Sequence, residues 1–329
     1  KYTPGSGIPE LRERVAASWR ERYGAPWCAA QSVITVGGKA ALFELALALF
    51  EEGQEVVVPA PCWVSFPEQI RFAGAVPVFV ETSGEDGFRV HADAVLAAVT
   101  DRTRAILLNS PSNPTGGVVA PEDLKEIVAE AARRGLLVVS DETYERFVYD
   151  GACHASAASL AAEFPETVVL VGSFSKTYAM TGWRIGYALG PAQVIRAVEQ
   201  IQSHATSNPT SFAMVGAVAA LAEAEESVAP MIAAYQERRD FLIPRLAALP
   251  GFECQPPAGA FYAFPRVAGA YRPGRQGSGA FAEFLLEKAG VAVVPGEAFG
   301  SDEHIRLSFA CSLETLALGI ERMQAVLAD

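Results

Sequence analysis

Cysteine and histidine are scarce in this chain, and neither is arranged to bind a metal or to form disulfides. The four histidines show no metal-ligand spacing, so the sequence predicts no metal site. The five cysteines are scattered without a CxxC motif, at Cys28, Cys62, Cys153, Cys254 and Cys311. Scattered cysteines indicate reduced, buried thiols rather than a disulfide framework, and they favour a cytoplasmic protein.

Basic residues are outnumbered as well. The chain has 26 lysines and arginines against 38 aspartates and glutamates, which gives a net charge of -12 at pH 7. This balance argues against binding to nucleic acid or to an anionic membrane surface. No uncharged apolar run approaches the roughly 18 residues that a membrane span needs, because Glu44 interrupts the longest candidate, residues 40–50. We therefore predict neither a nucleic-acid partner nor a membrane partner.

Repeats and low-complexity tracts are also missing, and half of the 329 residues are hydrophobic, as in a globular protein with a large core. Alternating apolar strands and helices indicate an α/β fold with a mostly parallel sheet covered on both faces. The acids that follow Pro121 favour a helix start there. Strands are predicted at residues 32–36, 56–58, 76–80, 105–108, 136–139 and 168–171, and helices at 40–50, 66–72 and 121–133.

The pattern changes in the C-terminal third of the chain. A helix predicted at residues 225–246 leads to a smaller α+β domain. That domain is expected to contain a hairpin or strand pair at 252–264, a helix at 278–289, strands at 291–294 and 305–309, and a closing helix at 313–327. We therefore divide the chain into a large domain, residues 1–236, and a small C-terminal domain, residues 237–329.

Residues 173–186, SFSKTYAMTGWRIG, carry the most informative motif. Lys176 follows a predicted buried strand and lies among hydroxyl side chains, and Arg184 comes eight residues later. A lysine in this position can form an imine with a carbonyl cofactor, while the serines and the arginine can hold a phosphate. Taken alone, the motif is equally compatible with a surface turn and a solvated lysine.

A second segment upstream changes that balance. There the predicted strand at residues 136–139 leads to Asp141, and Tyr144 follows three residues later. A lysine, an aspartate and a tyrosine at the ends of strands are what pyridoxal phosphate chemistry requires.

With these segments the chain resembles the fold-type I pyridoxal-phosphate enzymes of the class I and II aminotransferase family. It is most similar to the bacterial aspartate aminotransferases, a group that includes members accepting prephenate. The resemblance runs from Tyr2 almost to the C-terminus. Besides the two segments above, its motifs are Gly37-Gly38-Lys39, Pro61-Cys62-Trp63, Asn109-Ser110-Pro111-Ser112-Asn113-Pro114-Thr115-Gly116, Gly259-Ala260-Phe261-Tyr262 and His304-Ile305-Arg306-Leu307-Ser308.

The resemblance implies a role for each catalytic residue. Lys176 would bind pyridoxal 5'-phosphate covalently and, once substrate displaces it, would carry a proton to and from the substrate. Asp141 would keep the pyridine nitrogen protonated. Tyr144 and Asn113 would donate hydrogen bonds to the phenolic oxygen of the cofactor.

The resemblance also implies how the cofactor and the substrate are held. The phosphate would lie against Gly37-Gly38-Lys39 at a helix N-terminus, and Trp63 would stack on the ring. Ser173, Ser175 and Arg184 would complete the phosphate site.

The substrate would be bound by two cationic side chains. Arg306 would bind its α-carboxylate, with Asn113 and Trp63 close by. Lys39 would contact the distal carboxylate of an acidic substrate, unless its side chain only faces water.

The predicted reaction is a ping-pong transfer from an acidic amino acid, with aspartate favoured, to 2-oxoglutarate. Prephenate, aromatic or neutral amino acids stay open as substrates, and so does a β-lyase or decarboxylase reaction on the same cofactor. A different class, the effector domain of a pyridoxal-phosphate-binding transcriptional regulator, is the rival interpretation.

The family pattern around Tyr2 implies that its hydroxyl contacts the cofactor phosphate of the other subunit. We therefore expect a homodimer with shared active sites. Family members usually carry some tens of residues before this motif, whereas this chain opens on it without an initiating methionine. An N-terminally trimmed large domain is the corresponding expectation.

Overall fold

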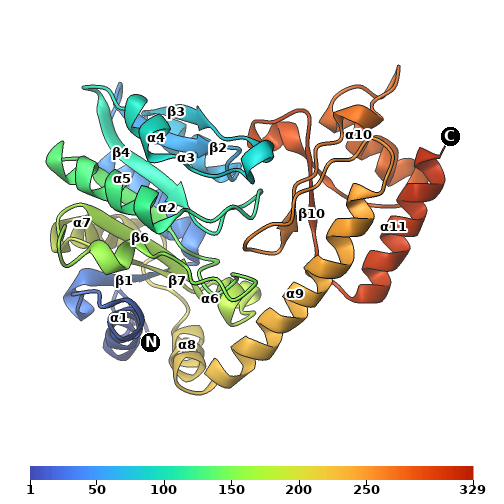
Figure 1. The fold of residues 1–329 in the computed structure, drawn as a ribbon. Coiled ribbons are helices and arrows are strands. Elements are labelled where there is room, and N and C mark those ends of the chain that lie inside the picture. Colours follow the sequence, from blue (N-terminus) through green and yellow to red (C-terminus); the bar gives the residue numbers. More distant parts are fainter. Residues whose placement is uncertain (329) are drawn as a thin grey trace.

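The computed structural model describes residues 1–328. It contains one seven-stranded sheet and one three-stranded sheet (Figure 1). Along the large sheet the strands follow the order β1 (Ser32–Thr35), β7 (Gly186–Leu189), β6 (Val168–Ser173), β5 (Leu137–Asp141), β4 (Thr103–Asn109), β2 (Glu55–Ala60) and β3 (Val76–Glu81). β6, β5, β4, β2 and β3 pair in parallel, while β7 is antiparallel to both of its neighbours. The predicted mostly parallel α/β sheet is confirmed.

Alternate residues of the central strands point to opposite faces of the large sheet, and both faces are buried. Val138 packs into the hydrophobic core on one face, and its neighbours Leu137 and Val139 pack into the core on the other. The first face is covered by α1 (Pro9–Tyr23), α4 (Ala92–Ala97), α5 (Pro121–Arg133) and α8 (Ser211–Glu223). The second is covered by α2 (Gly38–Leu49), α3 (Ser65–Phe72) and α7 (Ala192–Ala205). Strands buried on both sides explain why their sequences are apolar throughout.

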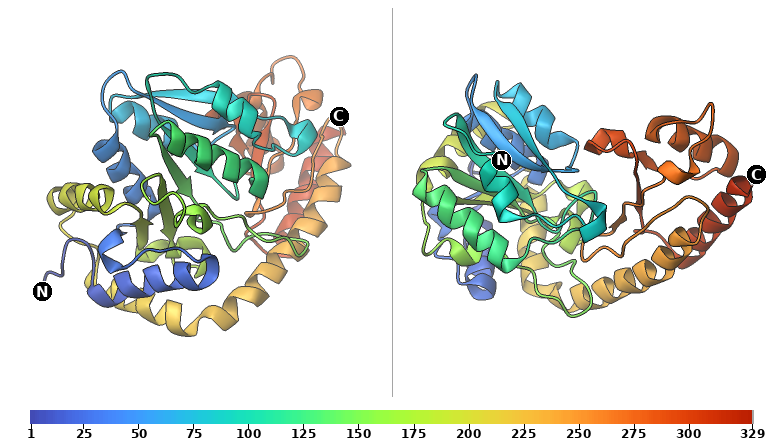
Figure 2. Two further views of the ribbon diagram at one scale, coloured as in Figure 1. Left: turned by 60° about the vertical axis from the view of Figure 1, so that its left-hand side comes forward. Right: turned by 45° about the horizontal axis from the view of Figure 1, so that its top comes forward.

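The long helix α9 (Glu225–Ala247) leads from the large sheet to the small one (Figures 1 and 2). The predicted division after residue 236 falls inside this helix. A separate hydrophobic core joins it to the C-terminal elements. These are β8 (Tyr262–Ala263), α10 (Ser278–Phe284), β9 (Val294–Pro295), β10 (Ile305–Ser308) and α11 (Leu313–Leu327), with β10 in the middle of the small sheet. The helices predicted at 225–246 and 313–327 are confirmed.

The strand pair predicted at residues 252–264 is wrong. Only β8 forms within this segment, and it pairs with the distant β10 rather than with a local partner. Glu253 makes a single isolated bridge to Arg266. Pro256 and Pro257 lack the N–H groups that a ladder requires, which prevents a continuous hairpin.

No helix among residues 1–328 has both the length and the apolar character to cross a membrane.

Candidate active site

A cavity of about 340 Å³ lies at the carboxyl ends of three neighbouring parallel strands. β4, β5 and β6 end at Asn109, Asp141 and Ser173, and all three residues line the cavity. Carboxyl ends of parallel strands share one sheet edge, where ligands of open α/β folds bind. The predicted site residues found in its lining are Gly38, Lys39, Trp63, Asn113, Asp141, Tyr144, Ser173, Ser175, Lys176, Arg184 and Arg306.

Lys176 lies in a single helical turn, α6 (Phe174–Thr177), rather than in the loop that the sequence suggested. The Ser173 hydroxyl caps this turn by accepting the N–H of Ser175 at 3.1 Å. The Lys176 Nζ atom lies 5.7 Å from the ring centroid of Tyr144 and 5.3 Å from that of Phe261. Burial, followed by the positive charges of Arg306 and Arg184, lowers the pKa of Lys176. A lowered pKa makes the neutral, nucleophilic amine easier to reach.

Asp141 is the last residue of β5, and its carboxylate is buried. Burial raises the pKa of Asp141 to about 6, although the hydrogen bonds from Thr143 oppose the shift. The Thr143 N–H donates to Oδ1 at 3.1 Å. The hydrogen bonds from Thr143 do not offset the cost of burying the charged carboxylate. A cationic N–H donor would stabilise it, so Asp141 fits a protonated ring nitrogen.

Arg306 and Asn113 bond to each other across the cavity. The Arg306 Nη1 group donates to Asn113 Oδ1 at 2.8 Å, while the buried Nε of Arg306 has no partner among the residues described. Burial lowers the pKa of the Arg306 guanidinium. An arginine with an unsatisfied, buried N–H is suited to a bidentate carboxylate.

The N-terminus of α2 is shaped to hold an anion. Gly37 caps this helix with φ 82°, and a Cβ atom there would lie 2.4 Å from Arg184 Nη2. Gly37 is not one of the residues that line the cavity, but it lies against Arg184, which is. Arg184 donates through Nη1 to Thr181 O at 2.8 Å. Backbone N–H groups at a helix start, a forked cation and two serines fit a phosphate group.

Lys39 and Trp63 lie together in the lining of the same cavity. The Nζ atom of Lys39 lies 4.8 Å from the ring centroid of Trp63, within the range of a cation–π contact. Trp63 also packs edge-on against Phe66, with ring centroids 5.3 Å apart. These contacts give the exposed lysine a preferred position beside the indole.

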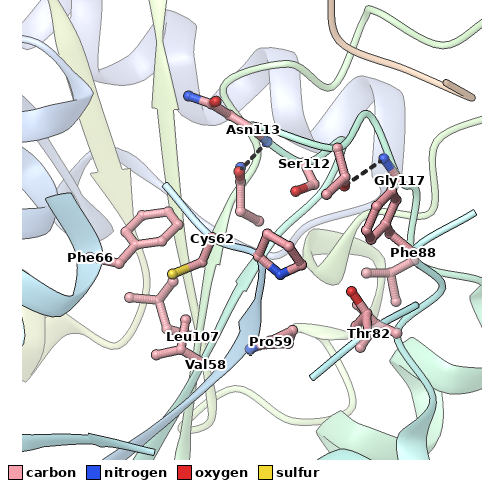
Figure 3. Close-up of a pocket in the computed structure, with 15 residues that line it drawn as sticks. Val58, Pro59, Cys62, Phe66, Thr82, Phe88, Leu107, Ser112, Asn113 and Gly117 are labelled. Atoms are coloured by element: carbon pink, nitrogen blue, oxygen red, sulfur yellow. Dashed lines mark hydrogen bonds between the residues drawn. The ribbon is translucent and has the colours of Figure 1, made fainter. Parts of the chain in front are cut away.

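A second, small cavity of about 20 Å³ also has Asn113 and Asn109 in its lining (Figure 3). The Asn113 N–H donates to Asn109 Oδ1 at 2.9 Å, and this bond fixes the loop after β4. Cys62 lines the cavity, and burial raises the pKa of its thiol to about 12. The thiol therefore stays protonated near neutral pH, which favours a packing role over a nucleophilic one.

Tyr2 lies outside the large cavity and is 90% exposed, so its role toward a second subunit stays a prediction. Sequence reasoning missed four other lining residues, Leu42, Asn109, Thr143 and Thr181, and it left Tyr262 undecided between pocket and core. Aspartate side chains often accept a hydrogen bond from the backbone N–H two residues later, and this turn preference of Asp141 is the signal that could have indicated Thr143. Within residues 1–328, no group of three or more acidic, histidine or cysteine side chains could hold a metal ion.

Comparison with known proteins gives the family of this fold and site. The sequence profile of aminotransferase class I and II matches residues 1–323. The chain belongs to this family. This aminotransferase is 42% identical over 324 residues to the aspartate aminotransferase of Geobacillus stearothermophilus, covering 98% of this chain and 82% of the relative. It is 43% identical to the probable aspartate/prephenate aminotransferase of Aquifex aeolicus, covering 100% of this chain and 84% of that protein.

Solved structures agree with this aminotransferase fold. Thermus thermophilus aspartate aminotransferase with maleate superposes with a TM-score of 0.93 at 42% identity, covering 99% of this chain and 84% of that one. An aromatic aminotransferase from Pyrococcus horikoshii gives a TM-score of 0.93 at 38% identity, covering 100% and 88%. The predicted family, the fold type and the enzyme class are confirmed.

Proposed function

We propose that this aminotransferase uses pyridoxal 5'-phosphate to transfer an amino group from an acidic L-amino acid, with aspartate favoured, to 2-oxoglutarate by a ping-pong mechanism. The observation that carries the proposal is the pair of cations, Lys39 and Arg306, in the lining of the cavity that also holds Lys176. Two cations beside one nucleophilic lysine suit a substrate with two carboxylates. The names of the bacterial relatives support the same substrate class.

When bound, pyridoxal phosphate supplies a conjugated ring that accepts electrons from the substrate Cα. Asp141 would hold a proton on the ring nitrogen through a charge-assisted hydrogen bond. Tyr144 and Asn113 would orient the phenolic oxygen. The phosphate would lie among the N-terminus of α2, Ser173, Ser175 and Arg184, where a helix dipole and a guanidinium both favour an anion.

The protein side chains would then direct the chemistry at the substrate. The Arg306 guanidinium would bind the α-carboxylate, and Lys39 would bind the distal one. Holding both ends fixes the direction of the Cα–H bond, which selects proton removal over loss of the carboxylate. The Lys176 amine, whose pKa is lowered by burial, would take that proton and return it at the C4′ carbon of the cofactor.

A second candidate substrate is prephenate, which also has two carboxylates. The half-buried indole of Trp63 beside Lys39 offers apolar surface for its ring. A relative named for both aspartate and prephenate supports keeping this alternative.

Three further parts of the proposal concern the assembly and its setting. The protein would be a homodimer in which Tyr2 of each chain reaches the other chain's phosphate. The functional domains would be residues 1–236 and 237–329, joined within α9. The scattered cysteines favour the cytoplasm, since none of the described cysteines forms a disulfide.

An absorbance spectrum of the purified holoenzyme tests the function. The cofactor band should convert to the pyridoxamine form on addition of aspartate and return with 2-oxoglutarate. Conversion by prephenate or a neutral amino acid, but not by aspartate, would move the substrate assignment. No cofactor band after reconstitution with pyridoxal phosphate would overturn the proposal.

A further inference from the structure

Tyr262 contacts two of the predicted site residues at once. Its hydroxyl oxygen lies 2.7 Å from that of Tyr144, and its ring lies under the Arg306 guanidinium, 4.6 Å from the ring centroid to Cζ. Tyr262 is buried, although it lines the cavity. One side chain from the small sheet therefore links the tyrosine assigned to the cofactor with the arginine assigned to the substrate.

The backbone around Tyr262 holds it in this place from both sides. β8 pairs with β10, so that Tyr262 stands opposite Ser308, two residues from Arg306. On the other side, Ala260 has a φ of 55°, a left-handed conformation that alanine rarely adopts. The Ala260 N–H donates to Phe147 O at 2.9 Å, which ties this turn to the segment that follows Tyr144.

The Tyr144 hydroxyl has one hydrogen-bond partner among residues 1–328, and that partner is Tyr262. A tyrosine hydroxyl can donate one bond and accept another. Burial, and then the neighbouring Tyr262, raises the pKa of Tyr144 well above its ordinary value, so its proton is retained. Burial also raises the pKa of Tyr262. The other charged groups acting on Tyr144 and Lys176 are Asp141, Arg184 and Arg306.

We propose that Tyr262 is a positioning residue that acts through Tyr144: its hydroxyl donates to the Tyr144 oxygen, and Tyr144 in turn donates to the phenolic oxygen of the cofactor. The inference rests on the proposed function. Hydrogen bonds in a chain polarise one another, so the bond from Tyr262 to Tyr144 strengthens the bond from Tyr144 to the cofactor. The ring of Tyr262 makes a second contribution by supporting Arg306 from below.

The chain of hydroxyls has a spectroscopic consequence. A phenolic oxygen that is well satisfied by Tyr144 attracts the proton on the Lys176 nitrogen less strongly, so the chromophore formed with Lys176 loses that proton at lower pH. Tyr262→Phe removes the hydroxyl and keeps the ring. We expect it to raise the spectrophotometric pKa of this chromophore by roughly 0.4 to 1 unit, the equivalent of one hydrogen bond. The KM for aspartate should stay within about twofold, because the ring under Arg306 remains.

Two further variants make the test specific. Tyr235→Phe removes a hydroxyl from the same aromatic cluster, where Tyr235 stacks on Phe261 at 5.2 Å, and should leave the chromophore pKa unchanged. In a Tyr144→Phe background, Tyr262→Phe should have no additional effect on this pKa, because its route to the cofactor is already broken.

The results that would contradict this inference differ from those that would contradict the proposed function. A wild-type band that titrates, with the same pKa in Tyr262→Phe, would overturn this inference and leave the proposed function intact. A Tyr262→Phe shift that persists in the Tyr144→Phe background would show that Tyr262 acts by another route. A wild-type protein without any cofactor band would overturn the proposed function itself.

Discussion

Replacing Gly37 by alanine should weaken cofactor binding through Arg184. The added Cβ atom would lie 2.4 Å from Arg184 Nη2, much closer than two such atoms can approach, so the guanidinium must move. Gly37 also has φ 82° and ψ 161°, a backbone conformation that is nearly restricted to glycine. The substitution therefore has two separable effects, one on the backbone and one on the arginine.

The backbone effect has a matched control elsewhere in the chain. Gly277 caps α10 with φ 85° and ψ 157°, almost the same conformation, and its Cβ would meet only the Asp302 carboxylate at 3.1 Å. Alanine at either glycine should lower the free energy of unfolding by about 1 to 3 kcal/mol. Only Gly37→Ala should displace a guanidinium from a bound anion, which costs about 1.5 to 3 kcal/mol, or roughly a 10- to 150-fold increase in Kd.

The assay is equilibrium binding of pyridoxal phosphate to the cofactor-free protein, with urea unfolding measured in parallel. Gly37→Ala and Gly277→Ala should lose similar stability, whereas only Gly37→Ala should lose affinity for the cofactor. Unchanged affinity in Gly37→Ala would refute the reasoning, because the displaced Arg184 would then not be holding the phosphate. Equal losses of affinity in both variants would attribute the effect to the backbone alone.

Two further predictions concern the substrate and pH. Lys39→Ala should lower kcat/KM for aspartate by roughly 10- to 150-fold, the loss of one charge-assisted bond, with little change for alanine as donor; equal losses on both substrates would contradict the assignment of Lys39. Asp141 has a folded pKa of about 6 against an ordinary value of 3.8, so the folded state binds its proton more tightly than the unfolded state. In the cofactor-free protein, the stability of wild type relative to Asp141→Asn should therefore fall by about 2 kcal/mol as pH rises from 4 to 6. Denaturant titrations at both pH values measure this difference, and a constant difference would argue against a buried carboxylate.

Sequence patterns located six of the seven strands of the large sheet, all but β7, because these strands are mostly apolar. The helix predicted at residues 121–133 is α5, Pro121–Arg133, since a proline and two acids mark its start. The small domain was harder to predict. β8 has only two residues, and its partner lies in β10, more than forty positions further along the chain. Such short, non-local pairing leaves no alternation for a sequence pattern to detect.

The candidate site divides in the same way. Lys176, Asp141 and Arg306 could be found because each is a charged residue within an apolar strand or shortly after one. Tyr262 could not be assigned, since an aromatic residue in an apolar segment looks the same in a core as in a pocket wall. Its contact with Tyr144 depends on the turn at Ala260. An alanine in a sequence does not predict the left-handed backbone conformation found there. The role of Arg184 was predicted, but its close approach to Gly37 is visible only in three dimensions.

The strand order determines which native strand pairs can form at each stage of synthesis, because the chain is made from its N-terminus. β1 is complete at Thr35, yet its neighbour in the sheet, β7, begins only at Gly186. The first strand therefore cannot make its native pairing until the chain has been synthesised through β7. By Leu189 the large sheet can close, with Lys176 and Arg184 already present. Arg306 is the last of the predicted site residues to be synthesised. The part of the pocket assigned to the cofactor can therefore form on a nascent chain that does not yet contain the arginine assigned to the substrate.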